Sequence, residues 1–122
     1  MLFSFLFSAI KPEIKSLIRF TMFYIYFLYS SAADKYYVGF SSDPWARVLQ
    51  HNDNGSDTFT GKFCDWSLVA VFQATTNRAY AMKCESFIKK QKNRSFLLKM
   101  MEDDFVPYGV IDQLVRVPHL RD

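Results

Sequence analysis

The sequence is poor in several residue types, and each shortage excludes a class of protein. Of 122 residues, only four are glycine and four are proline, too few for a low-complexity or collagen-like chain. Its two cysteines, Cys64 and Cys84, stand in no metal-binding or redox spacing, so no Cys/His zinc site can be assembled. Without a secretory context, we expect both thiols to be reduced, in a cytoplasmic protein.

Long apolar runs are also missing. The N-terminal run from Leu2 to Ile10 is ended by Lys11, Pro12 and Glu13, whereas a membrane-spanning helix needs about 20 apolar residues. No basic region precedes this run and no clear cleavage site follows it, so we expect neither a stable membrane span nor a signal peptide. We interpret residues 1–21 as an N-terminal extension, with an interfacial membrane anchor as the less favoured alternative.

The residues that are present suit one globular domain with a single core. Half of the chain is hydrophobic and 18% is aromatic. Residues 22–29 and 35–40 are aromatic and β-branched runs separated by five turn-forming residues, which predicts an antiparallel hairpin. Asp43 is a candidate N-cap and Pro44 suits the first helical position, so we expect a helix over residues 44–53.

A polar cluster is predicted where this helix meets the hairpin. Arg47 and His51 are four residues apart and therefore share a helix face, which the short linker holds near Tyr26 and Tyr37. A guanidinium binds phosphate oxygens, and a phenol or imidazole can transfer a proton. Taken one residue at a time, the sequence favours the tyrosines as packing residues and Arg47 as a solvated surface charge.

The remaining pattern predicts an α+β domain. Residues 66–72 indicate a third, central strand, and two helices follow over residues 77–91 and 94–101, with Thr75 or Thr76 and Asn93 as their caps. We expect a three-stranded antiparallel sheet flanked by helices. Beyond residue 101 the pattern weakens, so residues 102–122 are expected to form a mobile tail.

Glu85 lies at the border between the apolar and charged sides of the helix at residues 77–91. Such a carboxylate can point into a cleft, where Mg²⁺ is usually held by one or two carboxylates with water and substrate phosphate. Without any further observation, the sequence favours the alternative, an ion pair with Lys89 worth about 0.3 kcal/mol.

The segment from Lys83 to Lys99 carries a net charge of +5, while the rest of the chain carries −2. A basic stretch of this kind suits binding to a nucleic-acid backbone, although a solvated helix face is an equally good interpretation. The loop at residues 58–62 adds hydroxyls and a cation. The candidate nucleic-acid contacts are Lys62, Lys89, Lys90, Lys92 and Arg94.

Five landmarks along residues 22–101 together resemble a known family. In order, they are Tyr24-Ile-Tyr26, Tyr37-Val-Gly39, Arg47, His51-Asn52 and Glu85. This spacing is similar to that of the GIY-YIG nuclease domain, closest to its small single-domain proteins, which resemble the N-terminal nuclease domain of excinuclease C, a component of the ABC excinuclease. Two positions depart from the pattern: Tyr24 replaces the first glycine, and Phe40 stands where repair-type relatives carry lysine.

The resemblance implies a metal-dependent endonuclease that hydrolyses DNA, with a place in repair or recombination and RNA not excluded as substrate. Glu85 would hold Mg²⁺ or Mn²⁺, and Arg47 would neutralise charge on the phosphoryl group. Tyr26 or Tyr37 would deprotonate the attacking water with His51 assisting, and the choice between the tyrosines stays open. The alternative is a nucleic-acid-binding module of the same fold with little or no catalysis.

Overall fold

The computed structural model describes residues 20–53, 63–91 and 93–120, together with residues 9, 11 and 12. The predicted contacts Lys62 and Lys92, and nearly all of the N-terminal extension, therefore lie outside the described residues. Among the residues that are described, no helix is long and apolar enough to cross a membrane.

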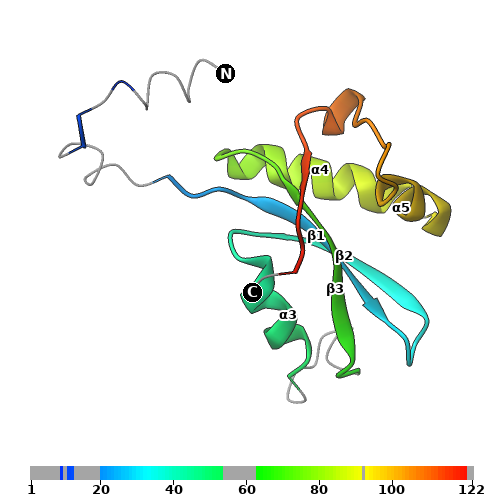
Figure 1. Ribbon diagram of the computed structural model, residues 1–122. Helices are drawn as coiled ribbons and strands as arrows, with labels where there is room; N and C mark the ends of the chain where they lie inside the picture. The colour runs from blue at the N-terminus through cyan, green and yellow to red at the C-terminus, as the bar shows by residue number, and fades with distance from the viewer. Residues whose placement is uncertain (1–8, 10, 13–19, 54–62, 92, 121–122) are drawn as a thin grey trace.

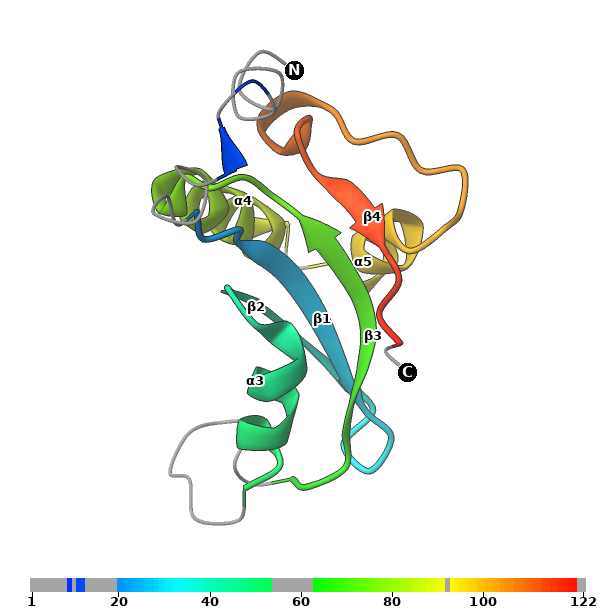
Figure 2. The ribbon, with the colours of Figure 1, turned by 60° about the vertical axis from the view of Figure 1, so that its left-hand side comes forward.

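Four antiparallel strands form one sheet in the order β2-β1-β3-β4 (Figures 1 and 2). The strands are β1 (Tyr24–Ser30), β2 (Lys35–Ser41), β3 (Trp66–Gln73) and β4 (Val115–Val117). The helices are α3 (Pro44–His51), α4 (Arg78–Lys90), α5 (Arg94–Met100) and the short 3₁₀ helix η2 (Gly109–Ile111). The α+β class, the hairpin and the three predicted strands are confirmed, and β4 is an addition to them.

The C-terminal segment differs from the mobile tail that the sequence predicted. Its strand β4 pairs with β3, and Ile111 and Leu114 are buried in the core. The Tyr80 hydroxyl donates to the Val110 carbonyl at 2.8 Å, which holds η2 against α4. The apolar residues of this segment are too few to fold alone, but the open edge of β3 and the side of α4 give them partners.

The helix caps agree with the sequence in two of three helices. Asp43 caps α3, with Pro44 in its first turn, and Asn93 caps α5. The cap of α4 is Asn77, whose side chain accepts from the Tyr80 backbone N–H, and not Thr75 or Thr76. The Thr75 hydroxyl instead accepts from the Asn77 N–H at 3.0 Å, which forms a turn before the helix begins.

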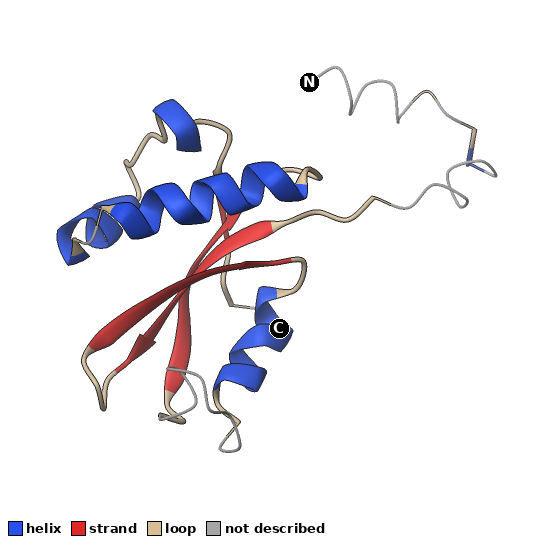
Figure 3. Ribbon diagram, turned by 180° about the vertical axis from the view of Figure 1, so that it is seen from behind, coloured by secondary structure: helices blue, strands red, loops and turns tan. Residues whose placement is uncertain are grey.

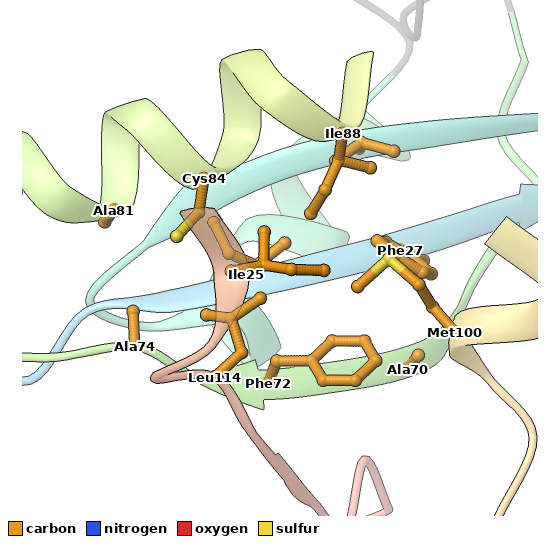
Figure 4. Close-up of a cluster of buried hydrophobic side chains, with 12 residues drawn as sticks. Ile25, Phe27, Ala70, Phe72, Ala74, Ala81, Cys84, Ile88, Met100 and Leu114 are labelled. Carbon is orange, nitrogen blue, oxygen red and sulfur yellow. The ribbon is translucent and has the colours of Figure 1, made fainter. Parts of the chain in front are cut away.

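The sheet carries helices on both faces, as Figure 3 shows from behind. On one face, Ala81, Cys84 and Ile88 of α4 pack onto Ile25 and other apolar residues of the strands (Figure 4). On the other face, Trp45 and Val48 of α3 pack against a more aromatic cluster that includes Tyr26. The period-two alternation of β1 supplies both clusters from one strand.

A β-bulge in β3 decides which of its residues face α3. The pairing of β1 with β3 shifts between Phe27 and Leu28, which lie opposite Ala70 and Leu68. The shift places one extra residue in β3 and reverses the alternation of the side chains beyond it. Trp66 therefore joins the aromatic cluster beneath α3.

Candidate active site

Tyr26 is the most buried member of the candidate site, with 1% of its surface exposed. Its ring crosses the neighbouring strand above Gly39, its register partner in β2. A Cβ atom at Gly39 would lie 2.5 Å from the Tyr26 hydroxyl oxygen and 2.6 Å from Cζ. Gly39 is thus required sterically, because any side chain there would displace Tyr26.

The Tyr26 hydroxyl lies 2.9 Å from Nε2 of His51, at the C-terminal end of α3. Burial raises the pKa of Tyr26 to about 12, an effect to which nearby Tyr37 and Glu85 add and which Arg47 opposes. Burial and then the positive charge of Arg47 lower the pKa of His51 to about 4. The pair is therefore neutral at pH 7, and in the tautomer with its proton on Nδ1, His51 accepts from the phenol.

The position of His51 is fixed by the residue that follows it. Asn52 donates from its side-chain amide to the Trp66 carbonyl at 3.0 Å and accepts from the Trp66 N–H at 2.8 Å. This two-way contact ties the end of α3 to the start of β3, across the connection at residues 53–65. His51, 7% exposed, is held beneath the helix against both tyrosines.

Tyr37 is half-buried and forms the more open side of the cluster. Its ring centre lies 4.7 Å from that of His51 and 6.3 Å from that of Tyr26. On the side of α4, the Lys89 ammonium lies 5.6 Å from the centre of the Tyr37 ring. Tyr37 is thus the residue at which the α3 side and the α4 side of the site meet.

Arg47 is exposed on α3, close enough to Tyr26 and His51 for its charge to act on both. Its Nη1 donates to Oε1 of Gln50, one helical turn further along, at 2.5 Å. The guanidinium is therefore oriented within α3 while it stays accessible to a ligand. A planar, permanently charged group in this position suits a phosphate.

Glu85 reaches the cluster from α4, with 21% of its side chain exposed. Its carboxylate lies 3.6 Å from the Lys89 ammonium, so the predicted ion pair is present. No group of three or more His, Cys, Asp or Glu side chains suited to a metal occurs among the described residues. A single carboxylate still fits Mg²⁺, because water and substrate phosphate supply most of its ligands.

The structure thus brings together the five residues that the sequence singled out: Tyr26, Tyr37, Arg47, His51 and Glu85. The predicted nucleic-acid contacts are less uniform. Lys89 lies at the site itself, and Lys90 is exposed at the end of α4. Arg94, at the start of α5, pairs with Asp34, with a distance of 3.1 Å from Nη1 to Oδ1.

The present roles of Gln50 and Asn52, and the contact of Lys89 with Tyr37, were not predicted. Gln50 orients Arg47, Asn52 anchors the end of α3, and Lys89 contacts Tyr37 in addition to its predicted partner Glu85. The three-residue spacing to Arg47 could have indicated Gln50. No local signal indicates that Asn52 bonds a strand 14 residues away.

Comparison with known protein families agrees with this geometry. The family described as the GIY-YIG catalytic domain matches residues 22–99, which include the tyrosines, Arg47, His51 and Glu85. No curated protein and no solved structure matches the chain. Because the match covers well over half of the sequence and contains the whole cluster, the chain belongs to the GIY-YIG nuclease family.

Proposed function

We propose that this protein is a metal-dependent endonuclease that hydrolyses phosphodiester bonds in DNA. The observation that carries the proposal is the meeting of two tyrosines, Arg47 and His51 in one cluster, with Glu85 at its border. Phosphodiester hydrolysis needs a base for the attacking water and a cation for the phosphoryl charge, and this cluster contains candidates for both.

Arg47 would bind the scissile phosphate. Its guanidinium is exposed, and Gln50 orients it on the side of α3 nearest the tyrosines. Two parallel N–H donors match two phosphate oxygens, and the positive charge opposes the negative charge that develops in the transition state. A lysine would keep the charge but lose the paired donors.

Tyr37 would act as the general base, with Tyr26 and His51 in support. Tyr26 is almost completely buried and engaged with His51, whereas Tyr37 is partly open and has the Lys89 ammonium beside its ring. His51, which is neutral at pH 7, keeps Tyr26 and the ring of Tyr37 in place.

Glu85 would hold Mg²⁺ or Mn²⁺ together with water and a phosphate oxygen. When bound, the metal ion polarises the phosphoryl group and compensates its charge. Lys89 is then the cation that must leave the carboxylate, and its long side chain can move to a phosphate oxygen of the substrate.

The remaining cations would bind the DNA backbone. Lys90 is exposed at the end of α4, and Lys62 and Lys92 belong to the same predicted set. Such contacts make binding salt-dependent and independent of sequence, so RNA also remains a candidate ligand. Cys64 and Cys84 stand in no redox spacing, which suits a reducing cytoplasm, where we place a role in DNA repair or recombination.

A second candidate function is a nucleic-acid-binding module that does not cleave. The ion pair between Glu85 and Lys89 favours it, because the carboxylate already has a cation as its partner. In this alternative, Glu85 would serve only to position Lys89 beside Tyr37.

Nicking of supercoiled plasmid distinguishes the two candidates. We expect the protein to nick with Mg²⁺ or Mn²⁺ and not with a chelator, and Glu85→Gln to lower the rate by at least about 100-fold. Glu102→Gln is the matched control, because Glu102 is an exposed carboxylate beyond α5. DNA affinity of Glu85→Gln should hold or rise. Equal nicking by Glu85→Gln and the parent would favour the binding module.

A further inference from the structure

A pocket adjoins the candidate site. This pocket lies between β2 and the helices α4 and α5 and has a volume of about 370 Å³. That size is at the lower end of the roughly 300–1,000 Å³ typical of small-molecule sites. Tyr37 and Lys89 line the pocket and also belong to the active site. We call it the β2–α5 pocket.

The lining of the β2–α5 pocket combines apolar surface with cations. Val38, Ile88 and Leu97 supply the apolar part, and Lys35, Lys89 and Arg94 supply positive charge. A ligand that suits this lining has a flat apolar body and a negative charge next to it. A nucleotide has both, in its base and its phosphate.

Arg94 is held in a fixed orientation on this pocket. Its guanidinium lies 5.3 Å from the centre of the Tyr36 ring and donates to both the side chain and the backbone carbonyl of Asp34. The side chain nevertheless remains 46% exposed. A planar guanidinium held in this way is a platform on which an unpaired base can stack.

The charges favour a base over an isolated phosphate as the occupant. Arg94 is paired with Asp34, and Lys89 is paired with Glu85, so much of the positive charge is already compensated. A stacked base in a duplex could not enter a pocket of this size without leaving its pair. The occupant is therefore a base that is already unpaired.

We propose that the β2–α5 pocket binds an unpaired nucleobase of the substrate strand, next to the scissile phosphate held at Tyr37. The inference rests on the proposed nuclease function and adds a substrate class to it: DNA with a single-stranded segment beside the cleavage point. Because Tyr37 and Lys89 belong to both sites, the base and the phosphate would lie close together on the strand.

The test uses a duplex with a short single-stranded arm, whose junction fixes the register of binding. An abasic site is placed at each arm position in turn, and the affinity of the full-length protein is measured by fluorescence anisotropy in chelator. We expect one or two adjacent positions to lose roughly five- to 100-fold in affinity, the range for loss of one stacked base. Equal affinity at every arm position would overturn the proposal.

Two variants test whether the loss of affinity at particular abasic positions is caused by the β2–α5 pocket. Arg94→Lys keeps the charge but removes the planar platform, and Leu97→Trp fills the pocket without a change of charge. Both should flatten the abasic profile, and Lys83→Ala should keep it, because Lys83 is an exposed cation of α4 that does not line the pocket. Thermal melting identifies variants that do not fold, and one folded pocket variant is enough for the test. An abasic profile that is unchanged in a folded pocket variant would contradict binding of the base in this pocket.

The outcome is independent of the nicking assay. A positional profile without Mg²⁺-dependent nicking would retain the pocket and reject the nuclease. Nicking without a profile would retain the nuclease and reject the pocket.

Discussion

The two faces of the sheet have the same strands but different chemistry. Beneath α4 and α5, Ile25 and Phe27 of β1 meet apolar side chains. Beneath α3, Tyr26 of the same strand meets His51 and Tyr37. Residues that are neighbours in the chain therefore belong to two environments, one that stabilises the fold and one that holds titratable groups.

The buried polar groups beneath α3 are hydrogen-bonded. No buried side-chain nitrogen or oxygen lacks a hydrogen-bond partner in the described part of the chain. This matters because a buried polar group without a partner costs about 1–3 kcal/mol. Glu85 and Lys89 are exceptions to the division, since both come from α4 and yet act on Tyr26 and Tyr37. The relative position of α3 and α4 therefore affects the candidate site directly.

The C-terminal segment connects the two sides. Near its start, the Tyr80 hydroxyl of α4 contacts Val110 and Gln113. Near its end, Nε1 of Trp45 in α3 donates to the His119 carbonyl at 2.9 Å. One segment thus bonds both helices that carry the candidate catalytic residues.

The largest expected effect is on activity alone. Tyr37→Phe removes the hydroxyl that we assign as the base, so the nicking rate should fall roughly 10²- to 10⁴-fold. The free energy of unfolding in urea should change by no more than about 0.5 kcal/mol, because the ring stays in place. A normal nicking rate in the folded variant would mean that Tyr26, and not Tyr37, is the general base.

A substitution in the apolar cluster that packs against α4 should lower stability and leave activity unchanged. Ile111→Ala removes a fully buried side chain beneath α4 and should lower the free energy of unfolding by about 2–5 kcal/mol. Nicking per folded molecule should not change. Leu98→Ala is the control, because this α5 leucine is exposed. A small effect of Ile111→Ala would instead support the mobile C-terminal tail that the sequence predicts.

Gly39→Ala should affect both properties, because the new methyl group would overlap the buried Tyr26 ring. We expect a loss of about 1–3 kcal/mol in the free energy of unfolding, the usual cost of overpacking. The contact with His51 should be lost as well, which an NMR titration of His51 can detect. Tyr26→Phe is the comparison, since it removes the contact without the overlap.

The smallest effect is on pH dependence. The folded pKa of His51 is about 4, against 6.5 for an unperturbed histidine, so the unfolded chain binds the extra proton between these values. The stabilisation is complete above pH 6.5 and is lost as the pH falls toward 4. We expect a loss on the order of 1–2 kcal/mol, measured by urea unfolding. His51→Gln should remove this dependence on pH, and His119→Gln should keep it.

Much of this fold could be predicted from local signals. The aromatic runs of β1 and β2, the cap at Asp43 and the apolar side of α4 each determine a local element. The contact between Tyr26 and His51 could also be predicted from the sequence, because the linker between β2 and α3 is short.

The parts that could not be predicted depend on distant contacts. Strand β4 forms only because β3 has an open edge, and the three residues of β4 carry no signal of their own. The bulge that turns Trp66 toward α3 depends on pairing with β1. The sequence predicts that Arg94 contacts DNA because it is a cation in a basic segment. The structure pairs it with Asp34, which lies 60 residues earlier in the chain.

The central claim is that Glu85 of α4 and the tyrosines beneath α3 share one metal-dependent site. Addition of Mn²⁺ to isotope-labelled protein tests it directly, since the paramagnetic ion broadens the NMR signals of nearby residues. We predict that Glu85, Tyr37 and His51 broaden at lower Mn²⁺ concentration than the other residues, and that Glu85→Gln shows no such pattern. Broadening that is unchanged in Glu85→Gln, or that is centred on another acidic group, would contradict the claim.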